Sequence, residues 1–160
     1  MGYVLSSFPN GFAGSISRSL DDVVISMANK SGAALAFGVP VALNTNGNGV
    51  VPFDGSTHTA ADFLGVTVRL PSKTPDTYGS KLANYAANEM VDVLVRGHIS
   101  VKMTGASSAK AGAAVAVNKS TGAFTVGSGD TVVQLSSAHL ARPVDDYGMA
   151  EIVLNVRNVI

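Results

Sequence analysis

The sequence predicts an all-β protein: a small antiparallel β-barrel or β-sandwich built of hairpins, with an extended N-terminal arm. Three observations predict this class. Glycine occurs 17 times in 160 residues, and Asn, Ser and Thr are frequent, as a chain with many tight turns requires. Short runs rich in Val, Ile, Leu and Thr lie between these turn residues. The longest run, over residues 90–103, alternates apolar and polar residues with a period of two.

The N-terminal 20 residues are expected to form the arm, and residues 21–160 a single β domain. The arm carries Phe8 and Phe12 among small and polar residues, and no strand period appears before Ser15. Exposed arms fray unless they dock on something. The two phenylalanines are therefore expected either to contact a neighbouring protein or to pack on their own domain.

The first half of the domain is expected to hold four strands. The first covers residues 19–27, with a short helix over 20–30 as the alternative. The next two, residues 39–43 and 50–53, flank an Asn- and Gly-rich hairpin turn. The fourth strand covers residues 64–70.

An irregular region over residues 72–88 follows, with a short helix over 81–88 as one interpretation. The 90–103 strand comes next. Gly97 lies in the middle of its apolar face and predicts a bulge or a sharp bend, while Leu94 breaks the alternation. Further strands are predicted over residues 113–117, 123–126, 132–135 and 150–156.

Two segments, residues 37–70 and 111–142, look like copies of one hairpin unit. Each has a glycine, an alternating strand, a turn that begins with asparagine, and an apolar return strand. After the hairpin, Phe63–Val66 corresponds to His139–Arg142. Duplication and chance similarity both explain the pattern, and either supports a β-sandwich or small barrel.

Charge and motifs exclude several functions. Charged residues make up 14% of the chain, whereas soluble domains usually carry about a quarter. Eleven basic residues balance eleven acidic ones, which argues against a nucleic-acid partner. No apolar run approaches the roughly 20 residues of a membrane span, so no membrane partner is expected. A neutral, charge-poor surface favours a protein that is covered in an assembly.

Catalytic and metal-binding patterns are missing from the sequence. There is no cysteine, and the three histidines share no metal-ligand spacing. His98 is interpreted as a solvated or interfacial histidine. Ser107 and Lys110 match an SxxK spacing, but they lie in a loop rich in glycine and alanine. We therefore expect no enzyme, no catalytic residue, no cofactor and no metal site.

Five segments carry a family resemblance: residues 11–18, 37–41 with the following hairpin, 63–68, 90–101, and the hairpin that starts at 111–112. In order and spacing they resemble the tailed-phage capsid decoration, or cement, proteins. The resemblance implies a small, β-rich, non-enzymatic virion protein that sits on the capsid exterior and is made in the host cytoplasm. Its implied partners are the major capsid protein and itself, as a homotrimer, and it would stabilise the shell across capsomer seams.

Under this interpretation the apolar, glycine-flanked arm is the candidate contact with the capsid or a neighbouring subunit. Its candidate residues are Phe8, Phe12, Ile16 and Arg18. Two alternatives stay open: a tail-tube or head-fibre structural protein, and a surface glycan-binding module that uses Tyr78 and Tyr85.

Overall fold

The computed structural model describes residues 10–70 and 84–155, and these residues are nearly all β. One short 3-10 helix, Ala60–Asp62, precedes the strand β5. The strands are β1 (Ile16–Asn29), β2 (Leu35–Ala36), β3 (Pro40–Leu43), β4 (Gly49–Pro52), β5 (Phe63–Thr67), β6 (Asn84–Tyr85), β7 (Met90–Lys102), β8 (Ala114–Asn118), β9 (Phe124–Val126), β10 (Val132–Arg142) and β11 (Met149–Leu154).

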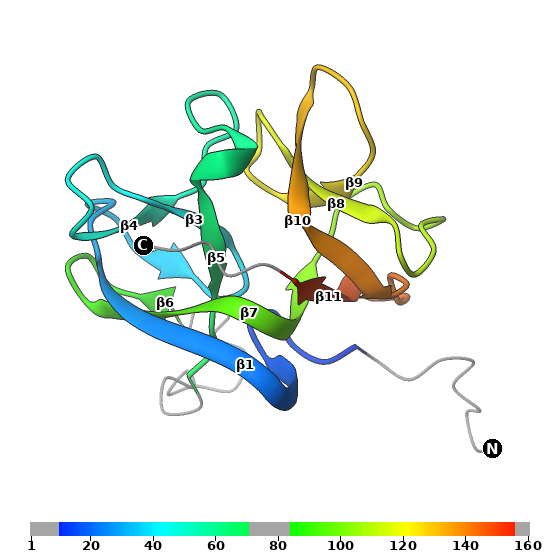
Figure 1. The fold of residues 1–160 in the computed structure, drawn as a ribbon, viewed down its shortest axis with the longest axis horizontal. Coiled ribbons are helices and arrows are strands. Elements are labelled where there is room, and N and C mark those ends of the chain that lie inside the picture. Colours follow the sequence, from blue (N-terminus) through cyan, green and yellow to red (C-terminus); the bar gives the residue numbers. More distant parts are fainter. Residues whose placement is uncertain (1–9, 71–83, 156–160) are drawn as a thin grey trace.

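Nine strands form one sheet in the order β1-β4-β3-β5-β7-β11-β10-β8-β9, and β1 also pairs with β7. The sheet folds into two lobes (Figure 1). The N-terminal lobe holds β1, β3, β4 and β5, the C-terminal lobe holds β8 to β11, and β7 pairs with strands of both. The end strands β1 and β9 do not pair with each other in the described sheet. A β-sandwich-like arrangement therefore fits, and the single closed barrel is wrong.

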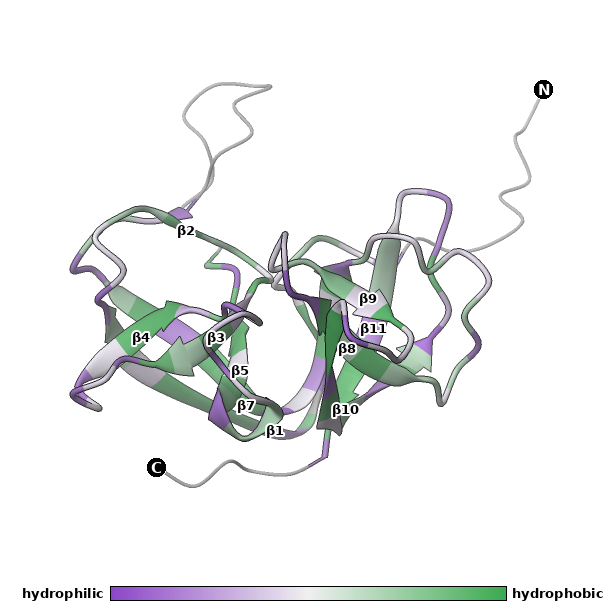
Figure 2. Ribbon diagram, turned by 90° about the horizontal axis from the view of Figure 1, so that it is seen from above, coloured by the Kyte–Doolittle hydropathy of each residue, from purple (hydrophilic) through white to green (hydrophobic). Residues whose placement is uncertain are grey.

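Two apolar clusters form the interior, and β7 contributes side chains to both. The N-terminal core lies within the N-terminal lobe and includes Val91, Val93 and Val95. The shared core takes residues from both lobes, including Ile99 and Val101 of β7 beyond Gly97. Figure 2 shows the two lobes side by side, with hydrophobic residues along the strands of each.

Leu94 broke the predicted alternation because β7 is covered on both sides. Its side chain is fully buried in the shared core, on the face opposite Val93 and Val95. A strand that is buried on one face only alternates strictly, whereas a strand between two cores does not need to.

Gly97 marks a large bulge, as the sequence predicted. Arg18 of β1 pairs with His98, and Val23 pairs with Arg96, so residues 19–22 stand opposite Gly97 alone. Gly97 adopts a φ of 123°, and a Cβ at this position would overlap the Asp22 carboxylate. The extra residues belong to β1, while the glycine on β7 provides the space for them.

Most of the predicted strands are confirmed, with shifted ends. The strand over residues 19–27 is part of the longer β1, and the alternative helix over 20–30 is wrong. The strand predicted to end at 135 continues to Arg142 as β10, and the strand predicted over 64–70 ends at Thr67 as β5. The described end of the suggested 81–88 helix is the strand β6, which pairs with β2. Neither β2 nor β6 was predicted, because a two-residue strand has no measurable period.

Candidate interaction surface

The arm is anchored to the C-terminal lobe by Asn10. This residue is 9% exposed, and its backbone N–H donates to Asp145 Oδ2 over 2.8 Å. Its side-chain Nδ2 donates to the carbonyls of Pro143 and Met149, each over 2.8 Å. The Ser100 hydroxyl of β7 donates to the Asn10 carbonyl. Sequence reasoning missed Asn10, since a buried asparagine looks like any turn asparagine until its distant partners are known.

Asp145 holds this anchor through an ionised carboxylate. Burial would raise its pKa, but backbone N–H groups of Asn10, Met149 and Tyr147 donate to the carboxylate and lower the pKa on balance. The same carboxylate therefore closes the turn between β10 and β11 and binds the arm.

The arm then crosses to the N-terminal lobe at Gly14. The Gly14 N–H donates to the Ser100 carbonyl over 2.8 Å, and the Arg69 N–H donates to the Gly14 carbonyl over 2.7 Å. A Cβ at Gly14 would lie 2.9 Å from the backbone nitrogens of both Arg69 and Gly38. Residues 10–15 are thus packed on the domain by backbone contacts.

The four predicted contact residues have different surroundings. Phe8 lies outside the described residues. Phe12 is 69% exposed, although the Arg69 guanidinium lies 5.1 Å from its ring centroid. Ile16 begins β1 and packs, partly buried, against the shared core. The structure therefore brings Phe12 and Ile16 onto their own domain while it leaves most of Phe12 accessible.

Arg18 takes part in an ion pair with a buried partner. Its Nε lies 2.8 Å from Glu151 Oε1, and Arg142 Nε lies 4.0 Å from Glu151 Oε2. Glu151 is 3% exposed, so removing Arg18 would leave a largely buried carboxylate with only the distant Arg142. Arg18 thus fixes β1 to β11, whatever else it contacts.

Three exposed apolar side chains lie along β1 and β7, from the bulge at residues 19–22 to the Ala28–Met90 pair at the other end of the ladder. Leu20 is fully exposed, and Val24 and Met90 are also exposed. Together with Phe12 and Tyr147, they are the large apolar residues that lie exposed in the described part of the chain. Single exposed apolar residues are ordinary, so these three mark β1 and β7 only as a candidate interaction surface.

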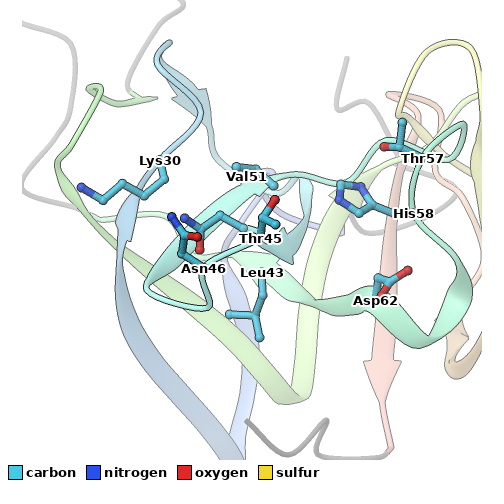
Figure 3. Close-up of a pocket in the computed structure, with 9 residues that line it drawn as sticks. Lys30, Leu43, Thr45, Asn46, Val51, Thr57, His58 and Asp62 are labelled. Atoms are coloured by element: carbon cyan, nitrogen blue, oxygen red, sulfur yellow. The ribbon is translucent and has the colours of Figure 1, made fainter.

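A separate polar hollow of about 730 Å³ opens beside the β3–β4 hairpin (Figure 3). Figure 3 shows Lys30 at one end and Asp62 at the other. Its polar groups are used in local turns. His58 Nδ1 accepts from the Asp54 N–H over 2.9 Å, and Asp62 accepts from the Thr59 N–H and hydroxyl. These hydrogen bonds to Thr59 lower the pKa of Asp62. The hollow presents no nucleophile with a base and an orienting group.

The other residues considered for chemistry lie outside this hollow. Ser107 and Lys110 are exposed in the loop before β8, and His98 is partly buried on β7. Within residues 10–70 and 84–155, no group of three or more His, Asp and Glu could hold a metal ion. No helix in the same part of the chain is long and apolar enough to cross a membrane.

Tyr85 cannot stack on a sugar, which corrects one of the predicted glycan contacts. It is fully buried, and its hydroxyl donates to the Val68 carbonyl over 2.6 Å. Burial raises the pKa of this hydroxyl to about 12. Its ring also packs edge-on against Phe37. Tyr78, the other predicted glycan contact, lies outside the described residues.

The anchored arm and the exposed apolar side chains of β1 and β7 are the features that could meet a partner, and the comparison with known families points to such a role. A family model described as "Structural cement protein (E217 gp24/Pam3 gp6)" matches residues 3–155. The chain belongs to this family of structural cement proteins.

This cement protein also shares its fold with a capsid component. A chain in the solved structure "The capsid of Myoviridae Phage XM1" is similar with a TM-score of 0.74 and 14% identity. The similarity covers 96% of each chain. None of the curated proteins matches it. The predicted family is confirmed, and the cement protein is a structural protein of a phage virion that stabilises the capsid.

Proposed function

We propose that this cement protein binds the capsid exterior across the seams between capsomers, with the major capsid protein as its partner. We also propose that it acts as a homotrimer, is made in the host cytoplasm and has no catalytic activity. A shell opens where its capsomers separate, so a protein that spans a seam adds contact area that must be lost first. Many such sites on one shell give high avidity from modest single contacts.

The observation that carries the proposal is the set of exposed apolar side chains along β1 and β7, Leu20, Val24 and Met90, in a chain of zero net charge. Burying apolar surface stabilises a complex by about 25 cal/mol per Å² before ordering costs. A neutral protein also meets no net repulsion when its copies crowd together on one shell. These properties suit broad contact with a capsid and with neighbouring copies.

The candidate residues then divide into two roles. Phe12 is the arm residue available for a partner, because most of its ring is accessible. Ile16 and Arg18 hold the start of β1 in place through the shared core and Glu151. Phe8 stays a predicted contact on the arm.

The test is binding to expanded capsids that lack the cement protein. The purified chain should cosediment with these shells and raise the temperature at which they release DNA or lose integrity. Light scattering of the free and shell-released protein gives the oligomer mass. Assembly of the purified protein into tubes or rings of six would contradict the proposal, and so would a failure to bind the shells.

A deletion variant tests the arm, and the structure decides where to cut. Removing residues 2–14 would also remove Asn10 and Gly14, which bond to the domain. Removing residues 2–9 keeps both. The shorter deletion should leave the unfolding temperature unchanged and weaken capsid occupancy, while unchanged occupancy would remove residues 2–9 from the contact.

A further inference from the structure

The bulge in β1 presents one leucine to solvent at its tip. Residues 19–22 leave the ladder between two paired positions, and Leu20 in this segment is fully exposed. The strand returns at Val23, which packs against the N-terminal core. Leu20 therefore projects from a strand that is held on both sides of the bulge.

The bulge carries several local costs. It requires Gly97 at a φ of 123°, a conformation that other residues rarely adopt. Asp22 Oδ1 is buried against this glycine and has no hydrogen-bond partner. The exposed Leu20 gains nothing from the fold. Such features persist in proteins where they serve a function, and bulges often direct a side chain toward a partner.

Two of the three charged residues beside Leu20 are paired within the chain, and the third, Asp22, turns its Oδ1 inward against Gly97. Asp21 Oδ2 lies 2.6 Å from Arg96 Nη2, and Arg18 pairs with Glu151. Neither pair needs a charged partner on the surface that covers the bulge. The complementary surface is therefore apolar and uncharged where it receives the leucine.

From this geometry we infer that Leu20 is an anchor residue that inserts into an apolar, uncharged pocket on the major capsid protein. The inference rests on the proposed function and identifies the part of the protein that carries it. A side chain that fills a fully desolvated pocket near the centre of an interface can carry much of the binding energy, and the ion pairs of Asp21 and Arg18 would then lie at the rim of that pocket.

The experiment compares three variants with the wild type in binding to expanded, cement-free capsids. Leu20→Ser removes the anchor, Leu20→Met keeps an apolar side chain of similar size, and Tyr147→Ser is the matched control at another exposed apolar residue. All three should unfold at the wild-type temperature, because these side chains are exposed. We expect Leu20→Ser to raise the Kd per site at least about tenfold, with the other two variants within about threefold of wild type.

The salt dependence tests the chemistry of the pocket. The wild-type Kd should change less than about twofold between about 0.05 and about 0.5 M salt, because the flanking ion pairs are internal. A steep loss of affinity with salt would overturn the uncharged pocket.

The outcomes separate this inference from the proposed function. Wild-type capsid binding with an unaffected Leu20→Ser variant overturns the anchor and leaves the function standing. Equal losses for Leu20→Ser and Tyr147→Ser show general apolar adhesion and also overturn it. A change in oligomer mass for Leu20→Ser places the bulge between copies of this chain and overturns the capsid pocket. No binding by the wild type contradicts the proposed function itself.

Discussion

The hairpin units of the two lobes repeat the same backbone hydrogen bonds in different surroundings. In the N-terminal lobe, the Gly38 N–H donates to the Thr67 carbonyl over 2.9 Å. In the C-terminal lobe, the Gly112 N–H donates to the Leu140 carbonyl over 2.7 Å. Both glycines have a positive φ, 70° and 88°. Thr67 in one unit is thus equivalent in position to Leu140 in the other, so the predicted correspondence of Phe63–Val66 with His139–Arg142 is wrong in register.

The two hairpin turns are also alike. The N–H of Asn44 donates to the Gly49 carbonyl and the N–H of Asn118 to the Ala123 carbonyl, both over 2.9 Å. Each asparagine side chain accepts a backbone N–H from its own turn. The sheet order is likewise equivalent, β4-β3-β5 in one lobe and β9-β8-β10 in the other. Of the two explanations of the repeat, duplication and chance similarity, these equivalences favour duplication.

The lobes differ in what covers the unit. In the N-terminal lobe β1 pairs with β4, and the arm packs on Gly38. In the described part of the C-terminal lobe, β9 has only a parallel bridge between Phe124 and Met103 in place of a strand like β1, and a Cβ on Gly112 would meet nothing within 4 Å. The hairpin unit is therefore a common scaffold, and the proposed binding features come from the arm and β1 that cover only one copy of it.

The largest expected effect on stability comes from substituting alanine at the two equivalent glycines, Gly38 and Gly112. Gly38→Ala places a Cβ 2.5 Å from the Gly14 nitrogen, in addition to the cost of a positive φ. Gly112→Ala has the cost of the positive φ alone. We expect losses in the free energy of unfolding of about 3 kcal/mol and about 1 kcal/mol, respectively. Urea denaturation measures both, and equal losses would show that the arm does not press on Gly38.

The next effect concerns the bulge that only β1 carries. Gly97→Ala should destabilise the protein by about 2–3 kcal/mol, because the new Cβ overlaps the Asp22 carboxylate at an unfavourable φ. Gly105→Ala is the control, since its φ is positive but nothing lies within 4 Å of the added Cβ. It should lose about 1 kcal/mol. Thermal unfolding measures the stability of both variants. A smaller loss of stability for Gly97→Ala than for Gly105→Ala would contradict the close contact between Gly97 and the bulge.

A smaller effect is expected at the arm anchor. Asn10→Ala removes two side-chain hydrogen bonds to the Pro143 and Met149 carbonyls and should cost about 1–2 kcal/mol. The exposed Asn46 of the β3–β4 turn is the control, and its alanine variant should lose less than about 0.5 kcal/mol. Hydrogen exchange should also become faster in residues 10–15 of Asn10→Ala. Wild-type exchange in that segment would mean that the backbone contacts of Gly14 suffice.

The smallest effect is a pH dependence of the same anchor. The folded-state pKa of Asp145 is lowered, so its contribution is present above the unfolded pKa of about 3.9 and is lost as pH falls through the folded value. The melting temperature of the wild type should therefore drop below about pH 4. Asp145→Asn should melt lower near neutral pH and should show a smaller drop in acid. Parallel wild-type and variant curves would exclude this carboxylate from the acid response.

Sequence patterns predicted the elements whose signals are local. A few consecutive residues were enough to predict three of these features: the alternation in β7, the turns at Asn44 and Asn118, and the bulge at Gly97. The lengths of β1 and β10 were underestimated, because their ends are polar and are held by distant strands. Of the exposed apolar residues, the sequence singled out Phe12 but not Leu20, since a leucine in a predicted strand looks like a core residue.

The sequence by itself determined the all-β class, most strand positions, the absence of a recognised catalytic motif, and the family. These properties depend on residue type and on spacing over a few positions. Only the tertiary structure decided that β1 joins β4 and β7, that Asn10 is an anchor and that Leu20 is exposed. Each of these results from contacts between residues far apart in the chain, such as the 135 positions between Asn10 and Asp145. Local periodicity carries no information about such pairs, because register and burial are set by the packing of the whole sheet.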